Sequence, residues 1–132
     1  MDTVANGGID TDVREFIRAH INSVEQLEAL LLLRAHPDQE WTAVRLNEEL
    51  RTSVTSAASR LTDLAGRGFV RVRADAGPTY CYDLVGKPLD GVVARLGQAY
   101  ASRRHEVINL IFAKPIENLR VFSDAFKLRR ED

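Results

Sequence analysis

The stretch AASRLTDLAGRGFV, residues 57–70, carries the strongest fold signal in the chain. Ser53 precedes it and is a favourable N-cap, while Gly68 suits the left-handed position just past the end of a helix. We therefore predict a helix over residues 54–65 that turns sharply into an extended segment at Phe69. Small and leucine side chains recur in it at helical spacing and form one inward face, which consists of Ala57, Ala58, Leu61, Leu64 and Ala65.

The hydrophobic period changes directly after this helix. Residues 69–73, FVRVR, alternate between apolar and basic side chains, as a half-exposed strand does. Residues 79–84, TYCYDL, predict a second strand, and the intervening ADAGP of residues 74–78 predicts a turn. We expect the two strands to form one β-hairpin.

Three further helices are predicted ahead of residue 53. They cover residues 12–21, 24–35 and 43–50, and leucines surround the middle one, which we expect to lie centrally in the core. From the third helix, either Val44 or Ala43 faces inward. The caps expected for the three helices are Asp12 with Glu15, Ser23 with Gln26, and Thr42.

The order helix, helix, tight turn, helix and β-hairpin over residues 23–84 is that of a winged helix-turn-helix domain. Residues 57–70 resemble the recognition-helix signature of bacterial regulators of the MarR and ArsR kind. That signature runs from a small pair through Leu-x-x-Leu to a glycine and two apolar residues that enter the wing. Trp41-Thr42-Ala43 is also similar to the start of the first motif helix in these regulators. The resemblance implies a mostly α domain with a β-hairpin wing (α+β) that binds double-stranded DNA and regulates transcription.

The resemblance covers about half of the chain, and we divide the remainder around it. We expect a disordered lead over residues 1–11, the winged helix-turn-helix domain over residues 12–85, and a helical extension over residues 86–132. One long amphipathic helix over residues 89–113 and a second after Pro115 are predicted in the extension. Such helices beyond the wing imply dimerisation in regulators of this kind, through a seam of Leu89, Val93, Leu96, Tyr100, Val107 and Ile111 that is closed by Phe122 and Phe126.

A second use of this apolar face is open. Two arginines, Arg103 and Arg104, interrupt the face and are difficult to bury. We expect them either to pair with acids such as Glu25 or Glu28 or to mark where the helix leaves the core. Within one monomer, the face would instead fold back on the first helix, against Phe16, Ile17 and Ile21.

The predicted DNA-reading surface is the side of residues 54–65 that lies opposite the inward face. Because the N-terminal residues of a recognition helix meet base edges, we assign this role to Thr55, Ser56, Ser59 and Arg60. Of these four, only Arg60 can bond guanine in a bidentate manner. Asp63 opposes the approach of phosphate unless it pairs with Arg67 one turn on. The residues expected at the DNA backbone and on the wing are Arg51, Thr52, Ser53, Arg71 and Arg73.

Overall charge is no argument for DNA binding. The 132 residues carry a formal net charge of −1. The acidity lies at the N-terminus, where residues 1–41 hold eight acidic and three basic side chains, so the remainder is mildly basic. Since the reading surface carries few cations, nonspecific affinity for DNA should be modest. DNA binding is therefore inferred from the sequence pattern.

No cofactor, metal site or catalytic group is predicted. The three histidines, His20, His36 and His105, are scattered without a second ligand at helical spacing. Cys81 is the one cysteine, which fits a reducing compartment, and we expect it to be a small core residue of the wing. Because neither a signal-peptide pattern nor a membrane-length apolar run is present, we expect a soluble cytoplasmic protein without a membrane partner. Since no catalytic group is placed, we expect no enzymatic activity.

The function predicted from the sequence is that of a homodimeric, sequence-specific transcription regulator. Two recognition helices about one DNA turn apart would occupy a pseudo-palindromic operator, and repression is favoured over activation. Since no sensing domain is evident, control by expression level or by a regulatory protein partner is expected. The alternative is a winged-helix adaptor that binds another protein and does not bind DNA.

Overall fold

The computed structural model describes residues 8–113. β1 and β2 pair as a two-stranded antiparallel hairpin. The predicted class, mostly α with a β-hairpin wing, is therefore confirmed. The elements follow one another as α1 (Thr11–His20), α2 (Val24–Ala35), α3 (Ala43–Leu50), α4 (Val54–Gly66), β1 (Val70–Arg73), β2 (Thr79–Tyr82), α5 (Pro88–Ser102) and α6 (Arg104–Phe112).

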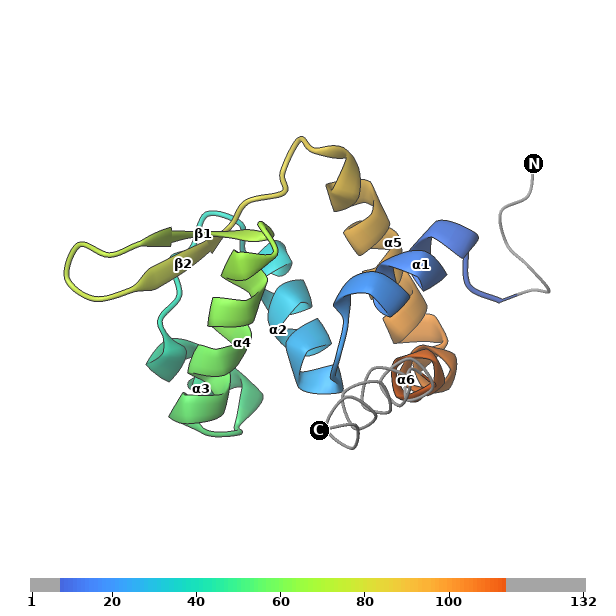
Figure 1. Cartoon of the computed structure of the whole chain (residues 1–132), viewed down its shortest axis with the longest axis horizontal. Coiled ribbons are helices and arrows are strands. Elements are labelled where there is room, and N and C mark those ends of the chain that lie inside the picture. The colour runs from blue at the N-terminus through green and yellow to red at the C-terminus, as the bar shows by residue number, and fades with distance from the viewer. Residues whose placement is uncertain (1–7, 114–132) are drawn as a thin grey trace, which may run out of the picture.

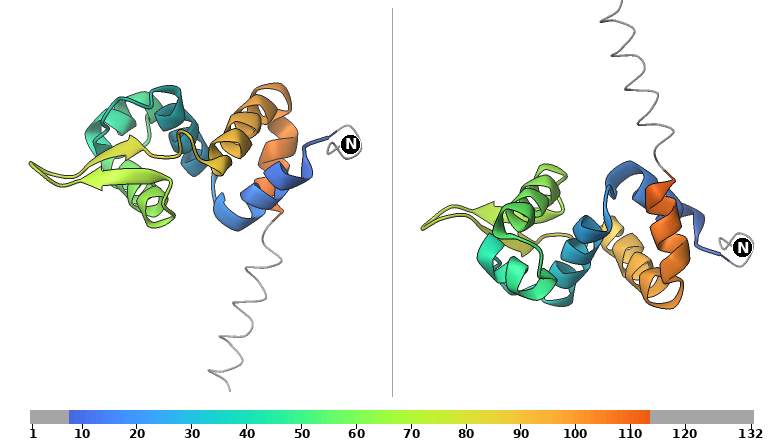
Figure 2. Two further views of the ribbon diagram at one scale, coloured as in Figure 1. Left: turned by 90° about the horizontal axis from the view of Figure 1, so that it is seen from above. Right: turned by 90° about the horizontal axis from the view of Figure 1, so that it is seen from below.

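Helix α2 lies between two groups of elements (Figure 1). On one side are α3, α4, β1 and β2, which we call the wing lobe. On the other side α1, α5 and α6 contact one another, and we call these three helices the terminal lobe. Figure 2 shows the same separation from two further sides, with the hairpin projecting away from the terminal lobe. Because α2 packs on both lobes, its leucines surround the helix, as the sequence predicted.

Helix α4 matches the helix predicted over residues 54–65. Ser53 Oγ accepts a hydrogen bond from the backbone N–H three residues on, at 3.0 Å. Gly68 has a φ of 81°, which glycine adopts without a steric penalty. Its N–H and that of the next residue donate to the carbonyls of Ala65 and Leu64, both at 3.0 Å, so the helix ends in a Schellman motif. The inward side chains of α4 are fully buried at Ala57, Leu61 and Leu64.

Of the predicted caps, Thr42 is confirmed and the one at Asp12 is wrong. Ser23 caps α2 as predicted, but Gln26 does not complete a capping box, because its Oε1 accepts from the Asn22 N–H at 2.6 Å. Ser23 and Thr42 each accept a hydrogen bond from the backbone N–H three residues on, at 3.0 and 3.1 Å. At α1 the N-cap position is Asp10, and no side chain caps the helix. Asp12 instead receives two hydrogen bonds from the Arg95 guanidinium, at 2.8 and 2.7 Å. These bonds lower the pKa of Asp12 and join the start of α1 to α5.

The wing hairpin is held to the rest of the chain at one end. Val70 pairs with Tyr82 and is buried, whereas Val72 is 46% exposed because the hairpin extends beyond the core. Trp41 adds a third strand position: its N–H donates to the Tyr80 carbonyl at 2.7 Å, and the Tyr80 N–H donates back at 2.8 Å. The sequence did not predict this bridge, which ties the wing to the segment before α3.

The single helix predicted over residues 89–113 is in fact two helices. Helical conformation is interrupted at Arg103 (φ −134°, ψ 51°), and α6 packs against both α5 and α1. The guanidinium carbon of Arg104 lies 4.5 Å from the Tyr100 ring centroid, and its Nη2 is 3.4 Å from a carboxylate oxygen of Glu28. The predicted pairing of this arginine with Glu28 is confirmed, and the break leaves both arginines at the surface.

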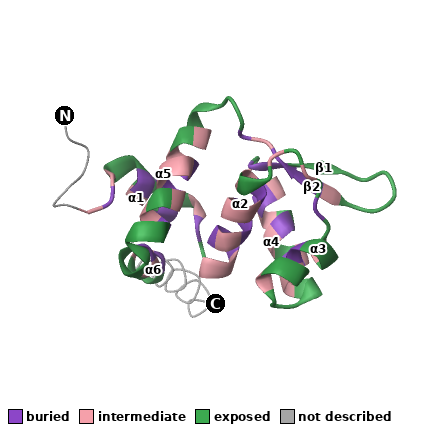
Figure 3. Cartoon of the chain, turned by 180° about the vertical axis from the view of Figure 1, so that it is seen from behind, coloured by how far each residue is buried: buried purple, intermediate pink, exposed green. Residues whose placement is uncertain are grey.

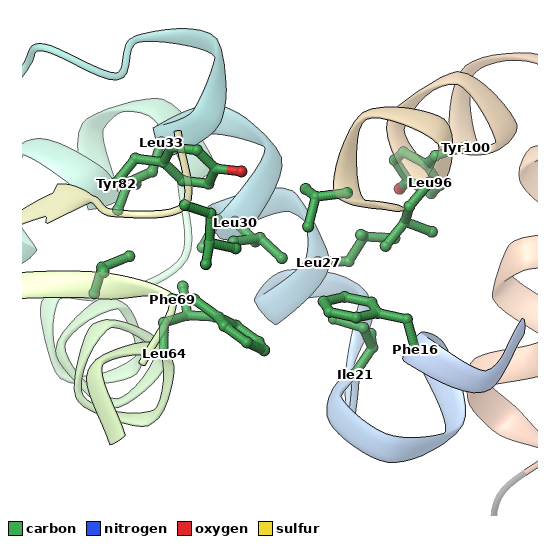
Figure 4. Close-up of a cluster of buried hydrophobic side chains, with 14 of the residues drawn as sticks. Phe16, Ile21, Leu27, Leu30, Leu33, Leu64, Phe69, Tyr82, Leu96 and Tyr100 are labelled. Carbon is green, nitrogen blue, oxygen red and sulfur yellow. The ribbon is translucent and has the colours of Figure 1, made fainter. Parts of the chain in front are cut away.

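The apolar face of α5 and α6 folds back inside the chain, which is the second use that the sequence left open. Helix α5 packs on α1, and Figure 4 shows Leu96 and Phe16 in one cluster of buried side chains. Leu89 is 36% exposed, while Phe122 and Phe126 lie outside the described residues. Five residues assigned to a dimer seam are therefore core residues of the single chain and not surface residues: Val93, Leu96, Tyr100, Val107 and Ile111.

One hydrophobic core runs through both lobes. The Phe16 ring of the terminal lobe stacks on the Phe69 ring at the start of the wing, with centroids 5.4 Å apart. Figure 3 shows buried surface along the facing sides of the helices and an exposed hairpin tip. Ile9 is only 3% exposed, so the chain joins this core inside the lead predicted for residues 1–11.

Candidate nucleic-acid interface

The turn between α3 and α4 brings together the residues predicted to contact the DNA backbone. Arg51 follows α3 in the left-handed conformation, with φ 59° and ψ 49°. Asn47 Oδ1 accepts a hydrogen bond from the Thr52 N–H at 2.9 Å, and Ser53 then caps α4. Arg51, Thr52 and Ser53 are exposed at the N-terminal end of α4, where unpaired helix N–H groups favour an anion.

The outer face of α4 is lined by hydroxyl groups. Thr55, Ser59 and Thr62 are exposed, and Val54 beside them is 45% exposed. A hydroxyl can donate to or accept from either a base edge or a phosphate, and a methyl group can contact thymine. This face is therefore compatible with a DNA groove, but it carries no charge of its own.

Two residues predicted to read bases turn toward α2. The Ser56 hydroxyl oxygen lies 2.8 and 2.7 Å from the two carboxylate oxygens of Glu25. Arg60 Nε lies 3.2 Å from Glu25 Oε1, but its N–H is not aligned with that oxygen, so the contact is an ion pair without a hydrogen bond. Ser56 and Arg60 are both half-buried against α2 as a result.

Glu25 is ionised at neutral pH. Partial burial raises the pKa of its carboxyl group, but the hydrogen bond from Ser56 and the positive charge of Arg60 outweigh burial and hold the pKa below its usual value. One carboxylate thus contacts both Ser56 and Arg60, two of the residues predicted to read bases. The sequence offered Glu25 only as a partner for the C-terminal arginines, because nothing in its spacing shows which way α2 faces α4.

The wing arginines lie at the surface, and each is paired. Arg71 Nη1 donates to Asp83 at 2.8 Å, and Arg73 lies 2.6 Å from Glu40 and 3.2 Å from a second acid, Asp75. More than half of each arginine side chain is exposed, at 56% and 55%, so water screens these pairs and they stabilise the fold little. A polyanion could therefore compete for both arginines.

The solved structures to which the chain is similar include two MarR proteins. Sco5413, a MarR family transcriptional regulator from Streptomyces coelicolor, is 22% identical with a TM-score of 0.54, over 87% of this chain and 84% of that one. A cysteine mutant of MarR from E. coli is 16% identical with a TM-score of 0.52, over 86% of this chain and 84% of that one. The chain has the MarR winged-helix fold. No protein-family model matches the sequence, and no curated protein matches it either.

Asp63 of this MarR-type winged helix points away from the outer face of α4. Its Oδ2 accepts hydrogen bonds from Gln26 Nε2 at 2.7 Å and from Arg67 Nε at 3.1 Å. Gln26 is fully buried and also donates to the His20 carbonyl at 2.8 Å, so it fastens α4 to the corner between α1 and α2. The predicted pair with Arg67 is confirmed, and the charge of Asp63 is neutralised within the fold.

The described residues also bear on the expectations for the cysteine, for a metal site and for a membrane span. Cys81 is buried, as predicted, and its thiol donates to the Pro37 carbonyl at 3.2 Å. Residues 8–113 contain no group of three side chains that could hold a metal ion. Nor does any helix in these residues combine the length and the apolar content that crossing a bilayer requires.

A groove between α2 and α5 is a feature that the sequence did not reveal. It encloses about 510 Å³ and is lined mostly by small and apolar side chains. A Cβ atom added at Gly97 would lie 3.3 Å from Leu31 Cδ2, so the two helices approach closely there. The available signal was the recurrence of small residues along α5 at helical spacing, at Ala94, Gly97 and Ala101.

Proposed function

We propose that this protein is a DNA-binding transcription regulator that places α4 in the major groove of double-stranded DNA. The observation that carries this proposal is the exposed row of Thr55, Ser59 and Thr62 on a helix whose opposite face is packed into the core. The fold likeness to Sco5413, which is named as a MarR family transcriptional regulator, supports the same use.

The proposed contacts fall into two groups. Thr55 and Ser59 contact base edges directly. Ser56 and Arg60 lie on the flank of α4 that faces α2, where Glu25 contacts both. The backbone group consists of the exposed turn before α4 and the wing, and it contains Arg51, Thr52, Ser53, Arg71 and Arg73.

The direct test is selection from a pool of random-sequence duplexes, followed by fluorescence anisotropy on the selected duplex across a salt series. Replacing both Thr55 and Ser59 by alanine should weaken binding to that duplex about 5-fold or more, because each hydroxyl hydrogen bond contributes about 0.5–1.5 kcal/mol. The matched control is Gln98→Ala with Ser102→Ala, two exposed positions on α5 that lie away from α4. Equal binding by the two double variants would contradict the proposal.

We further propose that the regulator is a homodimer that represses transcription from a pseudo-palindromic site. Its seam must use side chains that one chain leaves exposed, such as Phe112, which is 66% exposed at the end of α6. Phe122 and Phe126 remain predicted seam residues outside the described part of the chain. Sedimentation velocity of Phe112→Asp tests the seam, and a monomer that keeps its thermal stability is the expected result. A promoter reporter that falls when the protein is expressed tests repression.

A winged-helix adaptor that binds a protein is the second candidate, and the charge pairing favours it. Most arginines near the interface already have acidic partners, including Arg60, Arg71 and Arg73. Within residues 8–113, Arg51 is an interface arginine that has no ion-pair partner. The adaptor predicts no retention of any duplex at 50 mM salt, where a regulator should bind DNA most tightly.

A further inference from the structure

Arg60 is the side chain on α4 with the greatest capacity to discriminate between bases, and the fold holds it away from the outer face. Its guanidinium can form two parallel bonds to guanine, whereas the exposed hydroxyls of Thr55 and Ser59 bond any base. Yet Arg60 lies over α2, with Nε 3.2 Å from Glu25, and 31% of its side chain is exposed.

The carboxylate that holds Arg60 is itself oriented by α4. Both of its oxygens lie within hydrogen-bond distance of the Ser56 hydroxyl, which sits one helical turn before Arg60 on the same side of the helix. Glu25 lies in the first turn of α2, and 22% of its side chain is exposed. Because Ser56 fixes the carboxylate in place, the ion pair holds Arg60 in one position.

The contact between Arg60 and Glu25 is nevertheless one that can open. The Nε–H of Arg60 is not aligned with the carboxylate oxygen 3.2 Å away, and 31% of the arginine side chain is exposed, so water can compete for this ion pair. Removing the charge of Glu25 would therefore free Arg60 while leaving the helix packing of Ala57, Leu61 and Leu64 unchanged. Arginine has enough length and flexibility to reach the groove from this flank of the helix.

We propose that Glu25 is a positioning residue that determines the base specificity of α4, because it holds Arg60 away from guanine and leaves base reading to hydroxyl groups. The inference rests on the proposed DNA-binding function. It predicts that the native protein selects DNA sites in which Arg60 recognises no guanine. It also predicts that replacing Glu25 by an uncharged residue lets Arg60 recognise a guanine, although α2 itself does not enter the groove.

The experiment compares duplexes that each variant selects from one random-sequence pool, read by sequencing. The variants are Glu25→Gln, Arg60→Ala, the two combined, and Glu28→Gln as the matched control. Glu28 lies one turn along α2, carries the same charge, and bonds Tyr100 and Arg104 of the terminal lobe. Glu28→Gln thus removes an equal charge without touching Arg60. Thermal unfolding followed by circular dichroism establishes that each variant is folded.

We expect Glu25→Gln to acquire one guanine that the native protein does not select. Discrimination there should be roughly 5- to 150-fold, the value of a bidentate arginine–guanine pair. The double variant should lose this preference, while Arg60→Ala alone and Glu28→Gln should select the native sequence.

Three outcomes would overturn the inference. Arg60→Ala alone could change the selected sequence, which would mean that Arg60 already reads a base. Glu25→Gln could leave the selected sequence unchanged, or it could bind tighter with a steeper salt dependence and no new base preference, which would place Arg60 on phosphate. If the native protein retains no duplex even at 50 mM salt, the proposed function itself fails, and the inference fails with it.

Discussion

The wing lobe and the terminal lobe share one core but are assembled differently. The wing lobe consists of elements that follow one another along the chain, from α3 through α4 to the hairpin. The terminal lobe joins α1 to α5 and α6, and its Arg95–Asp12 bonds connect residues 83 positions apart. Neighbouring elements are specified by short-range signals such as caps and turns, whereas distant elements must find each other through packing.

An amphipathic helix face therefore predicts that its apolar side chains are buried, but it does not predict which element buries them. The same periodicity identified the inward face of α4 and the apolar face of α5. In α4, the capping serine and the C′ glycine place the helix against its immediate neighbours. In α5, the partner is α1, which lies far away in sequence, and a second copy of the chain would satisfy the periodicity equally well. Four predictions test how far the two lobes differ.

The largest effect is expected for an ionised side chain in the core of the terminal lobe. Leu96 is fully buried, so Leu96→Asp should unfold the protein, since it removes a packed leucine and buries a charge. The combined cost of several kcal/mol is comparable with the whole stability of a domain, about 5–15 kcal/mol. The measurement is circular dichroism at 25 °C. If the Leu96→Asp protein were folded and monomeric, Leu96 would instead belong to a dimer seam.

The second effect compares equivalent truncations in the two lobes. Leu61→Ala and Leu96→Ala each empty a fully buried position, and each should lower the free energy of unfolding by about 2–5 kcal/mol. Because the core is continuous, both variants should still unfold in one transition in urea, by tryptophan fluorescence and by circular dichroism. Separate transitions in the two signals would show that the lobes are independent units.

The third effect isolates the turn from α4 into the wing. Gly68 has a φ of 81°, so Gly68→Ala should destabilise the protein by about 1–2 kcal/mol. The control is Gly66→Ala, inside α4 with open space around the new Cβ atom, which should be neutral or stabilise by up to about 1 kcal/mol. Urea titration at 25 °C measures both variants. Equal changes in the midpoint would mean that the Schellman turn does not constrain the wing.

The smallest effect is a pH dependence that belongs to the terminal lobe. Burial and a hydrogen bond to Glu28 raise the pKa of Tyr100 from 10.0 to about 12. The folded state therefore favours the neutral phenol, and its contribution to stability is complete below pH 10 and is lost as the pH rises to about 12. The urea midpoint of Tyr100→Phe should fall less over this window than that of the native protein. Parallel curves for the two proteins would exclude this role for Tyr100.

Prediction from the sequence succeeded where one or two residues carry a local signal. Ser23, Thr42 and Ser53 cap their helices, and Gly68 ends α4, because each acts on backbone groups within a few residues. The prediction failed at Asp12, whose carboxylate accepts hydrogen bonds from Arg95 of α5, 83 positions away in the sequence. A local capping rule cannot include a partner that only folding brings near.

The same limit applies to the candidate site. The hydroxyl face of α4 follows from helical periodicity, since the inward residues define the outward ones. Whether Ser56 and Arg60 belong to that outward face depends on Glu25, which approaches from α2 in space. The spacing along α4 places these residues on a flank but does not indicate what lies beside them.

The order of the elements, the inward face of α4 and the turn into the wing can be predicted from the sequence alone, because they depend on backbone conformation and on side chains a few residues apart. Two features are visible only in the folded chain. The helix predicted over residues 89–113 is divided at Arg103 into α5 and α6, which pack on α1, and Glu25 forms an ion pair with Arg60. Those features depend on which surfaces come into contact during folding. An apolar face can be buried by any apolar partner and a charge can pair with any opposite charge, so neither identifies its partner in the sequence.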